Sequence, residues 1–113
     1  MELNGKILPQ WIDVETDGEK LQFLCAPLTS AQFLNLIPHF NLTVNNWTGD
    51  GTLLACKYAV RDWRGITHDG QPVPYTERDL ERFFEPMERH TILRGLATQI
   101  TLRSSLTEIE RKN

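Results

Sequence analysis

Long hydrophobic runs are missing from this sequence. No stretch approaches the roughly 20 consecutive apolar residues that a membrane-spanning helix requires, so a transmembrane segment is not expected. The opening residues Met1 to Lys6 are polar and lack the apolar centre of a secretory signal peptide. Together these absences predict a cytoplasmic protein that does not act on a membrane.

Clustered positive charge is missing as well. The chain carries 12 Lys and Arg against 15 Asp and Glu, a formal net charge of −3, and no basic run is longer than two residues. Nonspecific binding to phosphate needs a concentrated positive field. Nucleic acid is therefore not expected as the main partner.

Cysteine is scarce, with only Cys25 and Cys56, and each lies in an apolar run. Free cysteine behaves as a small apolar side chain and is often buried, and neither cysteine belongs to a CxxC motif. The sequence predicts two reduced thiols in the core of a cytoplasmic protein.

Recognisable catalytic and metal-binding motifs are also absent. No P-loop, GxGxxG or GxSxG segment occurs, and the three histidines lie in separate segments, at His39, His68 and His90. The acids considered for proton transfer are Asp62, Asp69 and Asp79. Their expected places in loops or at helix ends are explained by capping and solvation. We therefore expect neither an enzyme nor a bound cofactor or metal; the alternative, a small enzyme or metal protein, is tested by a metal assay.

What is present begins with two strand-like segments, residues 6–14 and 20–26. The second alternates apolar and other side chains with the period of a half-buried strand. Between the segments lies Asp17-Gly18, a dipeptide that suits a type I′ turn because both central residues must take positive φ. The sequence predicts an N-terminal β-hairpin, and Pro9 indicates that its first strand lies at a sheet edge.

Helical signals follow the hairpin. Thr29 and Gln32 form the capping box of a short helix that Pro38 ends, and an Asn- and Gly-rich loop is expected over residues 39–51.

A second helix is predicted from Asp50, as its cap, to about Trp63. Within it, residues at helical spacing would share one buried stripe, namely Leu53, Cys56, Val60 and Trp63. Gly65 and the glycines and prolines that follow it predict an extended loop.

The final third repeats the helix-start signal at Thr76, with Asp79 in a partial capping box. Pro86 interrupts that helix and suits the start of the next one. The last long helix is predicted to reach Ser104, with an apolar stripe of Leu93, Leu96, Ala97 and Ile100. Ser105 or Thr107 is expected to cap a short final turn.

These signals predict a single α+β domain over residues 1–113. Its parts are an N-terminal β-hairpin (1–27), a mainly α-helical body of four or five helices (28–105) and a polar C-terminal tail (106–113). The tail is most simply a solvated end, and the alternative is a segment that orders when it binds a partner.

Aromatic residues supply the candidates for partner contact. Trp47 lies in the polar, glycine-flanked loop, where an exposed Trp would anchor a contact. Phe83 and Phe84 are neighbours on a predicted helix and point about 100° apart, so both cannot face one narrow core stripe. One of them is therefore predicted to line a groove or an interface, whereas Trp63 is predicted to anchor the core.

The segment from Ala59 to Thr76 resembles a pattern found in the tail assembly chaperones of long-tailed bacteriophages and prophages. In that pattern a helix ends in Trp, a Gly-containing loop follows, and an aromatic residue with Ser or Thr opens the next helix. The matching residues are Val60, Trp63, Gly65, Asp69, Gly70, Pro72, Pro74, Tyr75 and Thr76. The ending, residues 105–113, is similar to the short acidic close of that family.

The resemblance implies a chaperone that binds the tape measure protein, a long apolar helical rod, and recruits tail tube subunits to it. It implies a place in the host cell cytoplasm and absence from the finished virion, and it leaves a homo-oligomer open. Such a task requires an adaptable apolar surface and no catalytic group. The alternative is a structural virion protein, such as a head–tail connector or a tail-completion subunit, which would remain in the particle.

Overall fold

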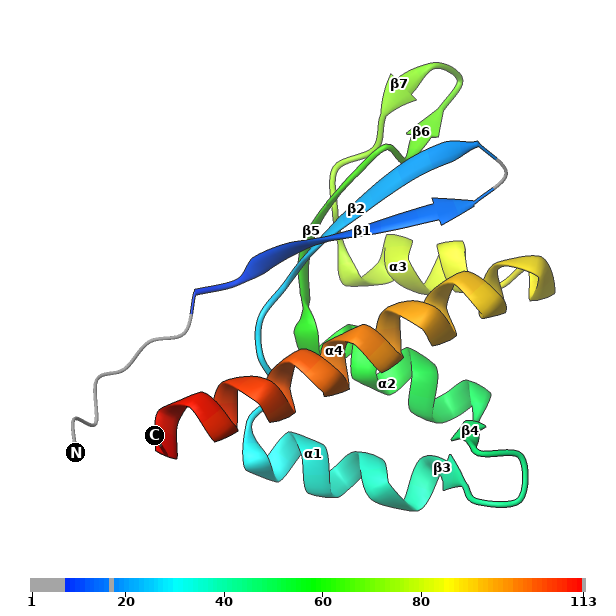
Figure 1. Ribbon diagram of the computed structural model, residues 1–113. Helices are drawn as coiled ribbons and strands as arrows, with labels where there is room; N and C mark the ends of the chain where they lie inside the picture. The colour runs from blue at the N-terminus through cyan, green and yellow to red at the C-terminus, as the bar shows by residue number, and fades with distance from the viewer. Residues whose placement is uncertain (1–7, 17, 113) are drawn as a thin grey trace.

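The computed structural model describes residues 8–16 and 18–112, in which a three-stranded antiparallel sheet lies against helices (Figure 1). Strand β1 (Gln10–Thr16) pairs with β2 (Glu19–Cys25), and β2 pairs with β5 (Val60–Arg64), in the order β1-β2-β5. The expected N-terminal hairpin is therefore confirmed, and β1 forms one edge of this sheet. The start of the predicted first strand at residues 6–7, and Asp17 of the predicted turn, lie outside the described residues.

Four α-helices occur within the described residues: α1 (Ser30–Leu36), α2 (Gly49–Ala59), α3 (Glu77–Phe84) and α4 (His90–Lys112). Two short 3-10 turns, η1 (Ile37–His39) and η2 (Met87–Arg89), follow α1 and precede α4. None of these helices has both the length and the apolar character needed to cross a lipid bilayer.

The prediction of a hairpin followed by a mainly α-helical body of four or five helices is wrong. Four α-helices are present in the described part of the chain, but strands recur through the region expected to be helical, between α1 and α3. β3 (Phe40–Asn41) pairs with β4 (Asn46–Trp47), and β6 (Thr67–His68) pairs with β7 (Gln71–Pro72). With the β1-β2-β5 sheet they make three small antiparallel sheets, so the fold is mixed.

The predicted capping box of α1 is confirmed. The Thr29 hydroxyl accepts the N–H of Gln32 at 3.1 Å, and the Gln32 side chain accepts the N–H of Thr29 at 3.0 Å. For α2 the predicted cap is wrong, because Thr48 rather than Asp50 fills that position and accepts the N–H of Gly51 at 3.1 Å. Asp50 lies in the first turn of α2, where a negative charge favours the helix start.

The segment predicted to complete the second helix is the strand β5. Helix α2 ends at Ala59, and the pairing register of β5 against β2 shifts between Val60 and Asp62, which leaves Arg61 as an extra residue. Such a β-bulge changes which side chains share a face. Val60 and Trp63 both become buried, although residues three apart in a regular strand point to opposite faces. Because of the bulge, Val60 and Trp63 are buried together although they are three residues apart, a spacing that in the sequence indicated a helix.

The loop expected after Gly65 is a hairpin of β6 and β7. Asp69 and Gly70 at its tip take φ of 50° and 76°, the positive values that a type I′ turn requires. Pro72 lies in β7, and the Val73 N–H donates to the carbonyl of Ile66 at 3.0 Å, closing the base of the hairpin.

The start of α3 follows the prediction, because the Thr76 hydroxyl accepts the N–H of Asp79 at 3.0 Å. Pro86 precedes the 3-10 turn η2, which leads directly into α4. Helix α4 continues without a break through residues 105–112, so the predicted cap and separate final turn near Ser105 are wrong.

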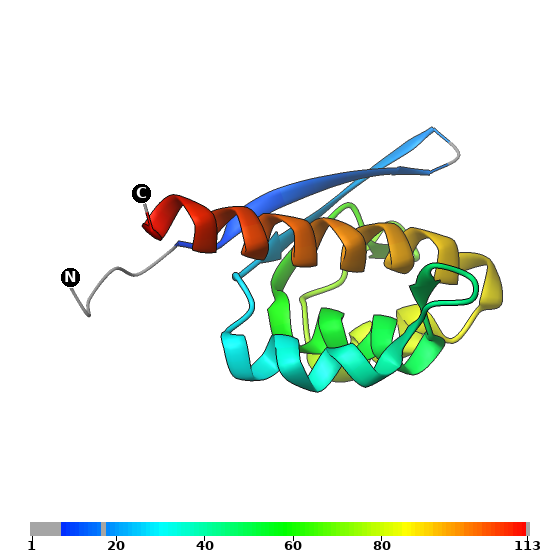
Figure 2. The same ribbon diagram turned by 60° about the horizontal axis from the view of Figure 1, so that its bottom comes forward.

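The core consists of two clusters on either side of α4, which crosses between the sheet and α1 and α2 (Figure 2). The first cluster joins the inner face of the sheet to the helices, through residues that include Phe23, Val60, Trp63, Leu80, Leu93, Leu96 and Ile100. The second cluster is smaller and contains Leu36, Trp47, Ala55 and Ala97. All four residues of the predicted α4 stripe are buried, which confirms that prediction.

Candidate partner-binding site

An apolar groove lies on the side of α4 that faces α1, next to the second core cluster, with which it shares Trp47. Its volume is about 460 Å³, within the range typical of ligand-binding hollows. Three separate segments line it, with Phe33 and Ile37 from α1 and η1, Phe40 and Trp47 from the β3–β4 pair, and Thr98, Thr101 and Leu102 from α4. No charged side chain is among these lining residues.

The β3–β4 pair forms one end of the groove. Phe40 and Trp47 are opposite each other in the strand register, and their rings meet edge to face with centroids 5.0 Å apart. Trp47 is only 9% exposed and belongs to the second core cluster. The expectation that Trp47 stands exposed in a loop is therefore wrong, although part of its ring surface lines the groove.

The walls of the groove expose apolar surface to solvent. Phe33 is 36% exposed, Ile37 51% and Leu102 52%. On the α4 wall, the Thr98 hydroxyl donates to the carbonyl of Arg94, and the Thr101 hydroxyl donates to that of Ala97. Burying such a surface against an apolar partner is favourable by about 25 cal/mol per Å².

Exposed apolar side chains are concentrated in the segment that runs from α1 to the β3–β4 turn. Helix α1 contains no charged residue, and it buries Leu36 against the second cluster while Leu34 remains exposed. Among the described residues, five of the eight large exposed apolar side chains fall within residues 33–44, namely Phe33, Leu34, Ile37, Leu42 and Val44. Of these five, Phe33 and Ile37 line the groove.

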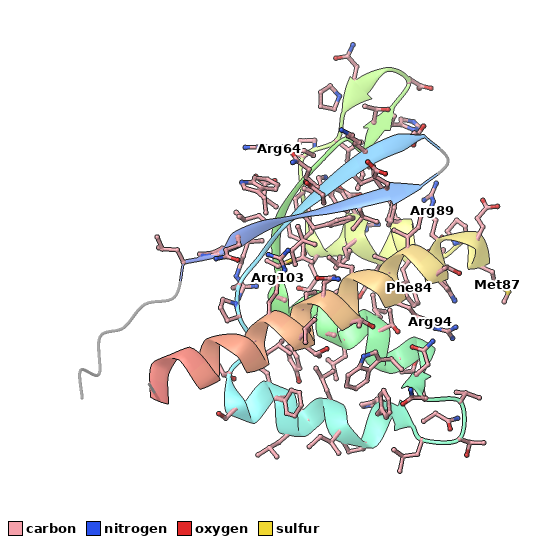
Figure 3. The ribbon with its side chains drawn as sticks, in the orientation of Figure 1. Arg64, Phe84, Met87, Arg89, Arg94 and Arg103 are labelled. Atoms are coloured by element: carbon pink, nitrogen blue, oxygen red, sulfur yellow. The ribbon has the colours of Figure 1, made fainter. Side chains whose placement is uncertain are left out.

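Arg94 lies on α4 one turn before Thr98. Its side chain is half-buried, and its Nε atom is buried with no hydrogen-bond acceptor among the described residues. Leaving a buried donor unpaired costs about 1–3 kcal/mol, so the position is unfavourable for folding alone. Figure 3 shows Arg94 extending from α4 away from the three-stranded sheet.

The other predicted contact residues, Phe83 and Phe84, lie outside this groove. Phe83 packs against Phe23 and Trp63, with ring centroids 6.4 and 6.1 Å away, and Arg89 stacks on it at 4.6 Å. Phe84 stacks on His90 with ring centroids 4.3 Å apart. Both phenylalanines pack against the first core cluster, whereas Trp47 belongs to the second, so the structure does not bring the three together.

The residues that carry the family resemblance build a structural junction. The Trp63 indole N–H donates to the carbonyl of Val73 at 2.7 Å, and the Trp63 ring meets Tyr75 edge to face at 5.1 Å. Gly65 takes a φ of 93°, and a Cβ atom there would lie 2.6 Å from the Lys20 carbonyl oxygen. These contacts join β5, the β6–β7 hairpin and the start of α3 into one unit.

A second hollow, of about 810 Å³, lies between that hairpin and α3 and is lined by charged residues of both signs. Asp79 lies 3.8 Å from Arg82 and also accepts the Thr76 hydroxyl, and Arg89 donates to the Phe83 carbonyl. These contacts hold Asp79, Arg82 and Arg89 in the local structure of α3 and η2.

The two thiols are poorly suited to nucleophilic chemistry. Burial raises the pKa of Cys25 to about 12, and Arg103 and Arg61 act in the opposite direction. Burial also raises the pKa of Cys56, whose side chain is fully buried. A thiol with a raised pKa stays protonated and unreactive. Within residues 8–16 and 18–112, no three His, Cys, Asp or Glu side chains gather as metal ligands.

No known protein family, characterised protein or solved structure matches this chain. The groove is therefore assigned from its own geometry. Sequence reasoning missed Phe33, Ile37, Phe40, Leu102 and Arg94 as site residues. A signal was present in α1, where four apolar residues within residues 33–37 span more of the helix circumference than packing on one neighbour uses.

Proposed function

We propose that this protein is a tail assembly chaperone of a long-tailed bacteriophage or prophage. It holds the tape measure protein in the host cell cytoplasm, recruits tail tube subunits to it, and is absent from the mature virion. Its role is binding rather than catalysis. Two observations support the proposal. The segment from Ala59 to Thr76 resembles the tail assembly chaperone pattern, and an uncharged groove lies between α1 and α4.

The groove is the single observation that carries the binding role. A long apolar helix in water exposes a stripe of side chains that would aggregate with other copies. A groove lined by aromatic and aliphatic residues shields such a stripe in the manner of other helix-in-groove complexes. Phe33, Ile37 and Leu102 offer the exposed surface, and the buried Trp47 and Ala97 hold it in place.

Co-expression with the tape measure protein of the same phage or prophage tests the proposal. Leu102→Glu places a charge in the groove and should lower the soluble yield of the tape measure protein at least severalfold. Met87→Glu is the matched control, because Met87 is 81% exposed and lies outside the groove lining. It should leave the yield unchanged.

An equal yield with both variants would contradict the groove as the holding surface. Circular dichroism of each purified variant shows whether Leu102→Glu still folds. Mass spectrometry of purified virions tests the remaining part of the proposal: a chaperone should be missing, whereas stoichiometric copies of this chain would establish a connector or tail-completion subunit instead.

A further inference from the structure

The position of Arg94 relative to the groove follows from helix geometry. Residues 94, 98, 101 and 102 of α4 lie on one face, because each is three, four, seven or eight positions from another. Four residues advance an α-helix by about 6 Å. Arg94 therefore stands just beyond Thr98, at the end of the groove lining.

The Arg94 side chain is half-buried and has no acidic partner among the residues that the structure describes. Its Nε donor is buried without an acceptor, and no carboxylate among the described residues forms an ion pair with Arg94. Arginine presents its N–H groups as a planar fork that matches the two oxygens of a carboxylate. A bound helix that covered this uncharged groove would exclude water from it, and such a pair would then be stronger than on an open surface.

We propose that the groove takes an amphipathic helix of a partner protein, with an apolar stripe that ends at a carboxylate bound by Arg94. This inference rests on the proposed binding function and names the chemistry of the segment that is bound. Apolar contacts with Phe33, Ile37 and Leu102 supply affinity, and Arg94 fixes the register of the helix along the groove.

A second copy of this chain fits the site less well. Two-fold pairing of identical surfaces would set one hollow against the other and leave both unfilled. It would also place Arg94 of each copy on the same uncharged surface without a carboxylate among the lining residues. A convex helix with an acidic residue satisfies both the shape and the charge of the site.

Synthetic helical peptides of about 20 residues test the inference directly. Each carries Leu at positions i, i+3, i+4 and i+7. One has Glu one turn before this stripe, one has Glu one turn after it, and the third has Gln at both places. Two placements are needed because the helix can lie in either direction along α4. Dissociation constants for the full chain are measured by calorimetry near physiological salt.

We expect one Glu peptide to bind about five- to tenfold more tightly than the Gln peptide, as a partly buried charge-assisted hydrogen bond provides. Arg94→Gln should abolish this preference while the Gln peptide still binds. Arg78→Gln is the matched control on an exposed arginine outside the groove lining and should retain the preference.

Equal affinity for all three peptides, absence of binding, or a preference that survives Arg94→Gln would overturn the inference. A dimer that Leu102→Glu dissociates would assign the groove to a second copy and would overturn it too. The peptides contain no tape measure sequence, so their behaviour is independent of the phage role. Suppose that one Glu peptide binds as expected but Leu102→Glu does not lower the soluble yield of the tape measure protein. The groove would then still bind an acidic amphipathic helix, and the chaperone assignment would be rejected.

Discussion

At the scale of single residues, Trp63 connects parts of the chain that are distant in sequence. It is 5% exposed, packs in the first core cluster and donates its indole N–H to Val73. Trp63→Ala removes this packing and should lower the free energy of unfolding by about 3–5 kcal/mol. Trp63→Phe retains most of the apolar volume and should lose less, about 1–3 kcal/mol, because the Val73 carbonyl loses its donor. Urea denaturation measures both variants.

Equal losses for the two variants would mean that the indole hydrogen bond, not the packing, dominates at this position. Unchanged stability in Trp63→Ala would contradict the core placement altogether. The sequence predicted Trp63 as a core anchor but placed it on the wrong kind of element, a helix rather than a strand.

The buried thiol of Cys25 should make the free energy of unfolding decrease at alkaline pH. Its pKa is raised from 9.0 to about 12 by burial, so above pH 9 the unfolded chain loses a proton that the folded chain keeps. The stabilising contribution of the neutral thiol is therefore complete below the unfolded pKa and decreases as the pH rises toward 12. Compared with Cys25→Ala, the parent protein should lose about 1.4 kcal/mol more between about pH 8 and about pH 10.

Urea unfolding of both proteins across that range provides the measurement. The variant has a different stability at every pH because it lacks the side chain, so only the difference in pH dependence is informative. Parallel pH profiles would show that Cys25 is accessible to water in the folded state.

At the scale of elements, the β5–β6 connection depends on Gly65 for two reasons. Its φ is 93°, and an added Cβ would lie 2.6 Å from a backbone oxygen. Gly70 supplies a matched comparison, with φ of 76° and no atom within 4 Å of an added Cβ. Gly70→Ala should cost about 1–2 kcal/mol for the left-handed backbone, and Gly65→Ala should cost clearly more because the clash adds to it.

Thermal unfolding of both alanine variants gives the comparison. Equal costs would show that the approach of Gly65 to Lys20 is relieved without loss of packing, and the junction would then be less rigid than its contacts indicate.

The elements differ in how far the sequence predicts them. The helix starts at Thr29 and Thr76 were predicted correctly. A capping hydroxyl bonds to residues within one turn, so the residues involved are close together in the sequence. The strand β5 was missed because a bulge at Arg61 gave Val60 and Trp63 the spacing of a helix. The β6–β7 hairpin was also missed, although its Asp69-Gly70 tip repeats the dipeptide type that identified the first hairpin.

At the scale of the whole molecule, the groove combines α1 and η1, the β3–β4 pair and α4. These segments meet through packing on Leu36, Ala55 and Ala97, which no local signal predicts. Trp47 was expected to be exposed in a polar loop. The β3–β4 pair instead buries it, and the exposed apolar side chains that line the groove are Phe33, Ile37 and Leu102. Partner contact at Trp47, Phe83 or Phe84 stays a prediction.

The most direct measurement of the central claim is photo-crosslinking in the complex with the tape measure protein. A photoreactive amino acid in place of Ile37, inside the groove, should crosslink to a helical segment of the tape measure protein that carries an apolar stripe. The same amino acid in place of the exposed Met87 should give little crosslinked product. A complex that forms but crosslinks only from position 87 would contradict the assignment of the groove as the surface that holds the partner.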